Sequence, residues 1–379
     1  MLWNKRLFKN INWFIPIATL LLIMVGLIAI SSALELNKET SLATIFLQKQ
    51  IVSVVLGFVV IIIMQFFDYR SLKHYADIIY LCTIGILGLI FVIGQTVSGG
   101  KRWINLGPVN FQPSELAKIM LIIVLAAVVD KNKDDIKYLL GFLKPVMYVI
   151  IPFTLILLQN DLGTSLVIII IFLAVMFVGG ANGIYMSLVF GGSFLSILLM
   201  IVSHLIWQTP LLFLKPYQLN RVIAFIDPKG APFTLGYQLN QSKIALGSGR
   251  LLGKGLFAGT QNQLEFLPES HTDFIFSVIG EEFGFIGALV VILLYLFLLW
   301  QIFKVAYNAR DNFGRLLAVG VGTMFFFHIF ENIGMTMGLM PITGLPLPFI
   351  SYGGSSMVTL LIAIGLVLNV NIRRKKIVF

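Results

Sequence analysis

The sequence predicts an all-α integral membrane protein that crosses the bilayer about ten times. Of the 379 residues, 58% are hydrophobic and only 12% are charged. A soluble domain carries about 25% charged residues, so a water-soluble globular fold is excluded. Apolar runs recur along the whole sequence, and each is long enough to cross a hydrocarbon core of about 30 Å as a helix. Residues 1–379 are therefore expected to form a single polytopic membrane domain.

The apolar runs also give the order of the elements. One long extramembrane segment, residues 204–272, separates the seventh run from the eighth and is large enough to build a site. It contains short apolar and amphipathic stretches that could lie along the interface as helices. The expected spans lie at roughly residues 13–33, 51–67, 75–94, 114–129, 144–159, 162–178, 184–203, 273–302, 315–338 and 355–371.

The basic residues predict the orientation of these spans. Most of the 27 Lys and Arg residues fall in segments that lie on the same side as the N-terminus, while the short loops on the other side hold only Lys38, Lys49, Lys101 and Arg102. Positive charge is retained in the cytoplasm. We therefore expect both termini to be cytoplasmic and residues 204–272 to form a large extracytoplasmic loop. The net charge of +10 is then an orientation signal, and no nucleic-acid partner is expected.

Two charged residues begin the fourth span. Glu115 and Lys118 follow Pro113, which suits the first turn of a helix. Their spacing of three residues places them on one helix face, within reach of each other. They form either a structural ion pair or a cavity-facing pair that orients a polar ligand.

Later spans contain further ionisable residues, namely Glu281, Glu282, Glu331 and His328. For the three glutamates a packing role with a hydrogen-bonded or protonated carboxyl is as well supported as a catalytic one. His328 is expected to form an interhelical hydrogen bond.

A polar stretch, residues 267–274, joins the large loop to the eighth span. Thr272 or Asp273 would cap the following helix by accepting its free backbone N–H groups. In the alternative interpretation Asp273 is a carboxylate at the membrane surface that acts as a general base on a lipid-linked substrate.

The segment between the last two spans breaks the apolar pattern. Residues 332–356 contain three prolines and five glycines, and also Ser351. Irregular backbone at membrane depth must be buried in protein or line a wet cavity. We expect a re-entrant outer segment.

Several blocks of the sequence resemble, in order, those of the SEDS family (shape, elongation, division and sporulation), and the resemblance covers essentially the whole chain. One departure is Asn160, where a proline is common in the family; it does not affect the proposed base. Residues 259–268 are more similar to the elongation branch than to the division branch. The matching blocks are residues 99–104, 112–118, 161–165, 267–282 and 332–356.

The resemblance implies a peptidoglycan glycosyltransferase that polymerises lipid II into β-1,4 glycan strands during cell-wall elongation and rod-shape maintenance. The family's catalytic aspartate matches Asp273, which would take the proton from the acceptor 4-hydroxyl while undecaprenyl pyrophosphate leaves with inversion. Glu115 and Lys118 match a polar pair of the family's cavity.

The pyrophosphate leaving group requires positive charge. Candidate substrate-binding residues on or near the outer face are Arg102, Lys118, Arg221, Lys243 and Arg250, with Ser351 in the Pro/Gly-rich segment. Each of the basic residues could equally be a solvated or headgroup-facing charge. No cluster of carboxylates has metal-ligand spacing, so no metal site is assigned, although Mg²⁺ or Mn²⁺ could screen the phosphates.

The resemblance also implies the surroundings of the protein. The site would lie on the extracytoplasmic face of the cytoplasmic (inner) membrane, among membrane lipids. The expected partners are a class B penicillin-binding protein, which cross-links the strands, and other membrane proteins of the elongation complex.

Three other functions compete with this interpretation. A lipid II flippase would use Glu115, Lys118 and the broken segment near residues 346–348, without Asp273 as a base. A division or sporulation role would keep the same chemistry. An intramembrane serine protease built from Ser355 or Ser356 with His328 is the least supported, because these residues lie about a span apart.

Overall fold

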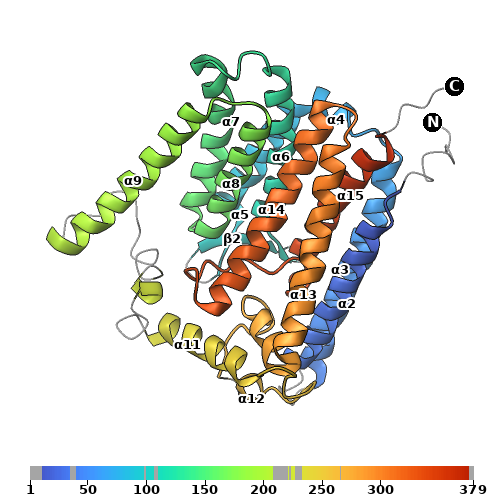
Figure 1. Ribbon diagram of the computed structural model, residues 1–379, viewed down its shortest axis with the longest axis vertical. Helices are drawn as coiled ribbons and strands as arrows, with labels where there is room; N and C mark the ends of the chain where they lie inside the picture. The colour runs from blue at the N-terminus through green and yellow to red at the C-terminus, as the bar shows by residue number, and fades with distance from the viewer. Residues whose placement is uncertain are drawn as a thin grey trace.

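The computed structural model describes residues 11–34, 40–97, 100–105, 110–207, 221, 223–226, 233–264 and 266–374. Within this part of the chain a helix covers each of the predicted spans, and most of these helices run side by side in one bundle (Figure 1). The long helices are α2 (Phe14–Leu34), α3 (Thr40–Gln65), α5 (Ala76–Ile93), α6 (Pro113–Lys131), α7 (Leu139–Leu158), α8 (Leu162–Val178), α9 (Gly183–Trp207), α13 (Ile275–Tyr307), α14 (Asn312–Met337) and α15 (Gly354–Ile372). Shorter helices are α4 (Ser71–His74), α11 (Phe233–Ser248) and α12 (Thr260–Gln263).

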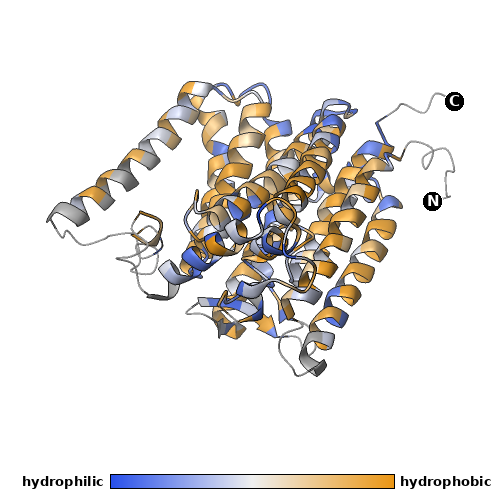
Figure 2. Ribbon diagram, turned by 60° about the horizontal axis from the view of Figure 1, so that its bottom comes forward, coloured by the Kyte–Doolittle hydropathy of each residue, from blue (hydrophilic) through white to orange (hydrophobic). Residues whose placement is uncertain are grey.

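Hydrophobic residues dominate the bundle helices and polar residues gather near their ends (Figure 2). Among the described residues, 7 helices are long and apolar enough to cross a membrane. Of the other three predicted spans, α6 carries Glu115, Lys118, Asp130 and Lys131, and α8 has only 17 residues. The third, α9, projects away from the bundle (Figure 1). The fold is that of an all-helical multi-pass membrane protein, as predicted.

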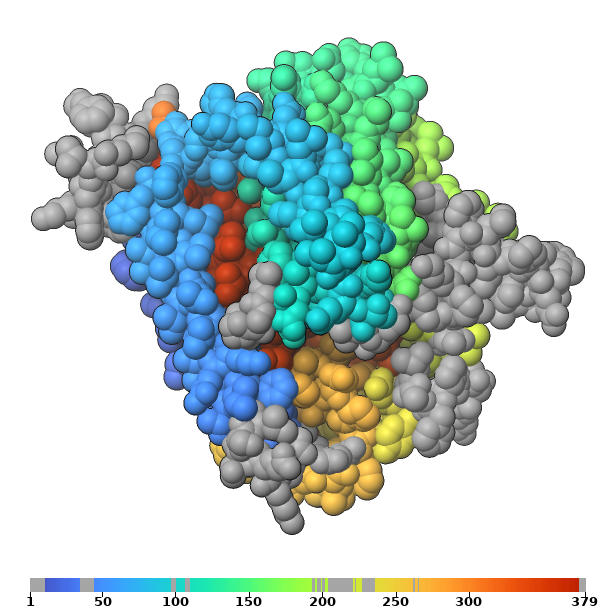
Figure 3. Space-filling view, turned by 180° about the vertical axis from the view of Figure 1, so that it is seen from behind, coloured from blue at the N-terminus to red at the C-terminus, as the bar shows by residue number. Residues whose placement is uncertain are grey.

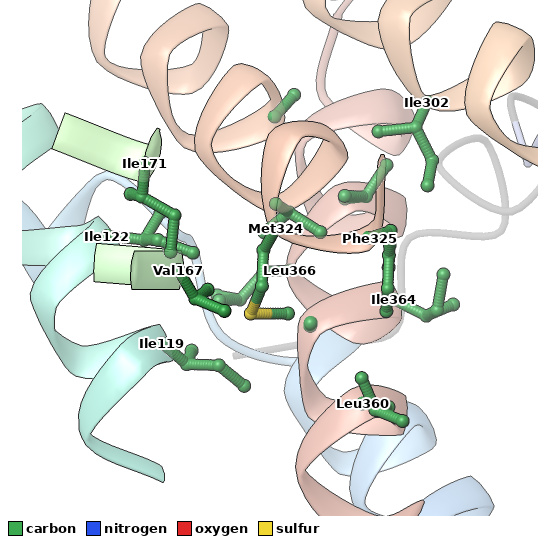
Figure 4. Close-up of a cluster of buried hydrophobic side chains, with 14 of the residues drawn as sticks. Ile119, Ile122, Val167, Ile171, Ile302, Met324, Phe325, Leu360, Ile364 and Leu366 are labelled. Carbon is green, nitrogen blue, oxygen red and sulfur yellow. The ribbon is translucent and has the colours of Figure 1, made fainter. Parts of the chain in front are cut away.

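Helix α14 occupies the middle of the bundle. Its side chains meet those of α6, α8, α13 and α15 in one apolar cluster, which includes Ile122, Val167, Met324 and Leu366 (Figure 4). A Cβ atom added to Gly320 would lie 2.7 Å from Ile122 Cγ2. The close approach of α6 to α14 therefore requires glycine at this position.

Polar contacts tie together the helix ends that were predicted to be cytoplasmic. Lys73 Nζ lies 2.5 Å from Asp130 Oδ2, and Asn312 Nδ2 donates to Asp130 Oδ1 at 3.0 Å. Arg373 Nε lies 3.8 Å from Asp68 Oδ2. The segments that share the predicted side of the membrane thus meet at one end of the bundle.

The opposite end holds a small antiparallel sheet. It comprises β1 (Gln95–Val97), β2 (Gly100–Asn105) and β3 (Asn110–Phe111) in the order β1-β2-β3, with Gln95 opposite Trp103 and Ile104 opposite Phe111. Strands this short give no alternating pattern that a sequence would reveal. Only helices were predicted from the sequence, so this sheet was missed.

The surface is hollowed on the face seen in Figure 3. The hollow lies between α3 on one side and α5 with the strands on the other, and α15 is visible at its bottom. Helices α3 and α15 pack closely along their length, since a Cβ on Gly57 would lie 2.2 Å from Leu361 Cδ1. The hollow is therefore an open side of the bundle with a helical floor.

Helix α13 is two helices joined at Gly284. This residue has φ 65 and ψ −164, which is not helical, and its backbone meets the chain of residues 249–254. The N–H groups of Phe285 and Ile286 donate to the carbonyls of Arg250 (2.8 Å) and Leu251 (3.1 Å). The break makes residues 275–283 a separate short helix that precedes the longer half of α13.

We expect Gly284→Ala to destabilise the protein by about 1–3 kcal/mol. The added Cβ would lie 2.3 Å from Gly253 N and 2.6 Å from Leu251 O, and φ would stay positive. Gly85→Ala is the matched control, because a Cβ there meets nothing within 4 Å and alanine favours a helix. Thermal unfolding in detergent should show a lower Tm for the first variant only. Equal Tm values would contradict the strained turn.

Candidate functional site

Asp273 lies just before α13 but does not cap it. The N-cap residue is Phe274, without a side-chain hydrogen bond to the helix, and Thr272 Oγ1 donates to Glu269 Oε2 at 3.0 Å. The capping interpretation of these residues is therefore wrong. Instead the Asp273 carboxylate faces Gly344, where an added Cβ would lie 3.2 Å from Oδ2. Gly344, with φ 77, leaves room beside the carboxylate that other residues would fill.

The Pro/Gly-rich segment is irregular and mostly buried, as expected. Residues 338–353, here called the outer segment, begin at Gly338, which ends α14 in a left-handed conformation with φ 73. Leu345, Leu347 and Ile350 are buried. Non-helical backbone at this depth is thus covered by protein.

The outer segment holds the chain around Asp273. Ser351 Oγ donates to Thr272 O at 2.6 Å and accepts from Leu347 N at 2.8 Å, and Tyr352 N donates to His271 O at 3.0 Å. The Ser351 hydroxyl, a predicted substrate-binding group, is therefore engaged with protein on both its donor and acceptor sides.

Helix α3 supports the far end of the outer segment. Gln50 is buried, its Nε2 donates to Ser351 O at 3.3 Å and its Oε1 accepts from Gly353 N at 3.1 Å. One amide thus satisfies both a donor and an acceptor of an irregular backbone.

The environment of Asp273 alters its acidity. The side chain is half-buried, and desolvation together with the nearby negative charge of Glu269 raises the pKa of Asp273 to about 6. The positive charges of Arg221 and Arg102 act in the opposite direction. The group is ionised near neutral pH but is more basic than an ordinary aspartate.

Two of the candidate arginines lie near Asp273. Arg221 Nη1 donates to Thr343 O, next to Gly344, at 2.7 Å. The guanidinium of Arg102 donates to the backbone carbonyls of Gln159 and Asn160. These contacts fix both positive charges at the outer end of the bundle, where both act on the Asp273 carboxylate.

Two of the three remaining basic candidates, Lys243 and Arg250, contact other parts of the structure. Lys243 on α11 packs against Gly338, where an added Cβ would lie 2.0 Å from Lys243 Cε. A lysine at the C-terminal end of α14 complements the helix dipole. Arg250 is exposed, and its carbonyl accepts from Phe285 N at the break in α13.

Glu115 and Lys118 form the predicted ion pair. Lys118 Nζ lies 2.7 Å from Glu115 Oε1, with side-chain exposures of 1% and 3%. Lys118 Nζ also lies 3.0 Å from His328 Nε2, and His328 Nδ1 lies 3.4 Å from Pro346 O. Because ammonium only donates, Nε2 accepts and Nδ1–H points to the carbonyl. The pair is linked to the outer segment through His328, which makes the expected interhelical hydrogen bond.

The same contacts argue against an intramembrane serine protease built from Ser355 or Ser356 with His328. Both ring nitrogens of His328 are engaged, with Lys118 and Pro346. Ser355 Oγ accepts from Gln112 N at 3.1 Å. In the described structure neither ring nitrogen of His328 is left to activate Ser355 or Ser356.

Glu281 and Glu282 have the packing role that was one of their two interpretations. Glu281 Oε1 accepts from Lys254 Nζ at 2.6 Å and from Gln261 N at 3.0 Å. Glu282 accepts from Ser32 of α2. The two carboxylates attach residues 254–261 to α13 and α13 to α2.

Two residues of α14 lie near Asp273: Glu331, for which a packing and a catalytic role were both open, and Asn332, which the sequence analysis did not single out. Asn332 Nδ2 donates to the carbonyls of Asp273 (2.9 Å) and Leu345 (2.8 Å), and Glu331 accepts from Thr343 Oγ1. The signal that could have revealed Asn332 was its position next to Glu331 in an apolar span. Among the described residues, no group of three or more His, Cys, Asp or Glu side chains could hold a metal ion.

A family model matches most of the sequence. Residues 12–376 match the FtsW, RodA and SpoVE family, described as cell cycle protein. The peptidoglycan glycosyltransferase MrdB of Escherichia coli K12 is 35% identical over 374 residues, which cover 98% of this chain and 97% of the relative. A probable peptidoglycan glycosyltransferase FtsW of Geobacter sp. M18 is 39% identical over 333 residues, covering 87% and 88%.

Solved structures share the fold. One belongs to work on the structural coordination of polymerization and crosslinking by a peptidoglycan synthase complex; it matches with TM-score 0.78 and 30% identity over 96% of this chain and 98% of that chain. The rod shape determining protein RodA of Thermus thermophilus matches with TM-score 0.69 and 28% identity, over 97% and 98%.

Proposed function

Because the chain belongs to the FtsW, RodA and SpoVE family, also called SEDS, we propose that it is a peptidoglycan glycosyltransferase that polymerises lipid II. The observation that carries this proposal is the Asp273 carboxylate, which is held against Gly344 with the charges of Arg221 and Arg102 nearby. A base and a cationic surface are the two requirements of this reaction.

In this mechanism Asp273 accepts the proton of the acceptor sugar 4-hydroxyl. The oxygen attacks the anomeric carbon of the donor from the face opposite undecaprenyl pyrophosphate, which leaves with its bonding electrons. The α-linked donor becomes a β-1,4 glycan. A pKa near 6 suits a base that must be ionised at neutral pH and still attract a proton.

Arg221 and Arg102 are the groups that we assign to the departing pyrophosphate. A guanidinium offers several donors in a geometry that matches phosphate. Mg²⁺ or Mn²⁺ could add to this charge by binding phosphate oxygens. Lys243 and Arg250 make other contacts and are not assigned to it. Glu115 and Lys118 are buried as an ion pair and reach the outer segment through His328, so we assign them a supporting role and no contact with the substrate.

We further propose an elongation role with a cross-linking partner. The similarity to RodA and to a chain of a peptidoglycan synthase complex supports a class B penicillin-binding protein as that partner. The similarity to FtsW proteins makes division the alternative role. The outer end of the bundle would face away from the cytoplasm, and both termini would be cytoplasmic.

Reconstitution of the protein with its class B partner and labelled lipid II, with cross-linking blocked, tests the function. A ladder of glycan strands on a resolving gel supports the polymerase. If no polymer forms but labelled lipid II moves across liposomes, a flippase replaces the enzyme. The partner is included because the protein alone could be inactive.

The rate of polymerisation should fall as the pH drops through about 6. Asp273 acts in its deprotonated form, and its pKa is raised to about 6. Glu269→Gln removes a neighbouring negative charge, lowers this pKa and should move the acid limb to lower pH. The profile of kcat/KM against pH measures the shift. Asp77→Asn, at the opposite end of the bundle, should leave the profile unchanged, and an unshifted Glu269→Gln profile would contradict the assignment.

A further inference from the structure

Two adjacent residues of α14 reach the turn that faces Asp273. Glu331 and Asn332 are both 0% exposed. Asn332 joins Asp273 O to Leu345 O, while Glu331 joins α14 to Thr343. The two side chains therefore form hydrogen bonds with both ends of the turn at residues 343–345.

The turn at residues 343–345 contacts both the proposed base, Asp273, and the positive charge of Arg221. Thr343 presents its hydroxyl to Glu331 and its carbonyl to Arg221 Nη1. The next residue, Gly344, lies against the Asp273 carboxylate. Any shift of this turn would move Arg221 relative to Asp273.

We propose that Asn332 and Glu331 are positioning residues for glycosyl transfer: they hold residues 343–345 so that Asp273 and Arg221 keep their spacing. This inference rests on the proposed function. Neither residue needs to touch the substrate. Both act through hydrogen bonds to the backbone and side chains that carry the base and the cation.

The chemistry of the two side chains fits this role. The Asn332 NH₂ group supplies two donors, and both go to carbonyls of irregular backbone that has no helical partner. The Glu331 carboxylate oxygen needs only to accept from Thr343, so it can act without a charge. A base displaced by about 1 Å can lose on the order of 10²-fold in rate.

Asn332→Ala and Asn369→Ala form a matched pair for the test. Asn369 Nδ2 also bridges two carbonyls, those of Met64 (2.5 Å) and Phe67 (2.9 Å), at the opposite end of the bundle. With lipid II as the probe and the partner present, we expect kcat to fall by about 100-fold for Asn332→Ala, with KM within about twofold. Asn369→Ala should lower Tm but keep kcat within about twofold.

A second set of variants keeps the test decisive if Asn332→Ala fails to fold. Glu331→Gln retains an oxygen that accepts from Thr343 and should retain near wild-type kcat, whereas Glu331→Leu should lose it. Thr343→Val removes the donor and should match Glu331→Leu. The double variant Glu331→Leu/Thr343→Val should be no slower than either single variant, because both break the same bond.

The outcomes separate the two proposals. An active wild type with unchanged kcat in Asn332→Ala or Glu331→Leu overturns the positioning role alone. A rise in KM without a fall in kcat also overturns it. A wild-type complex that makes no polymer overturns the proposed function, and the positioning role with it.

Discussion

Asp273→Asn should lower the rate of lipid II polymerisation by about 10²- to 10⁴-fold at neutral pH. The amide has nearly the shape of the carboxylate but cannot take the proton of the acceptor hydroxyl. Because Phe274 is the N-cap of α13, the change removes no helix cap, and stability should be little affected. Single-turnover kinetics on the reconstituted complex measure the loss.

Asp311→Asn is the matched control for this loss. Asp311 caps α14 by accepting from Gly314 N at 2.8 Å, at the end of the bundle far from Asp273. Its amide variant should keep the wild-type rate, with a stability cost of about 1 kcal/mol or less. An Asp273→Asn protein that is folded, bound to its partner and fully active would show that Asp273 is not the base.

Lys118→Met should destabilise the protein by about 3–5 kcal/mol. The change leaves the buried Glu115 carboxylate without its partner and removes the donor to His328 Nε2. It should also abolish polymer synthesis, because the outer segment loses a link through Pro346. Thermal unfolding in detergent and the glycan gel report the two effects separately.

Two control variants test whether the loss of stability comes from the burial of the Glu115–Lys118 pair. Glu115→Gln/Lys118→Met removes both charges and should recover much of the lost Tm, since no unpaired charge remains. Lys73→Met breaks the exposed pair with Asp130, in which the Lys73 side chain is 40% exposed, and should cost no more than about 1 kcal/mol. Equal losses in Lys118→Met and Lys73→Met would argue against a buried, interacting pair.

Local patterns in the sequence predicted most of the fold. Apolar runs located the helices because each helix must bury or expose to lipid a continuous apolar surface. Pro113 marked the first turn of α6, and the prolines and glycines of the outer segment marked its irregular backbone. The break at Gly284 was not predicted, because it results from contact with residues 250–253, far from it along the chain.

The site was only partly predictable for the same reason. Asp273, Arg102 and Arg221 were named as candidates from residue type and from the family blocks. Whether Asp273 capped a helix depended on how the chain before α13 folds, and that is decided by partners such as Asn332, whose hydrogen bond spans 59 positions. Lys243 and Arg250 show the converse, since residue type and predicted side alone cannot separate cations that the fold places apart.

The reach of Gln50 across to Ser351 and Gly353, over about 300 positions of sequence, bears on how the protein is made. During synthesis α3 is made early. The Gln50 side-chain amide has neither of these two partners until residues 351–353 have been made. Contacts of such long separation form late. The segment that faces Asp273 therefore cannot have its full set of hydrogen bonds until residues 351–353 have been synthesised and have met α3.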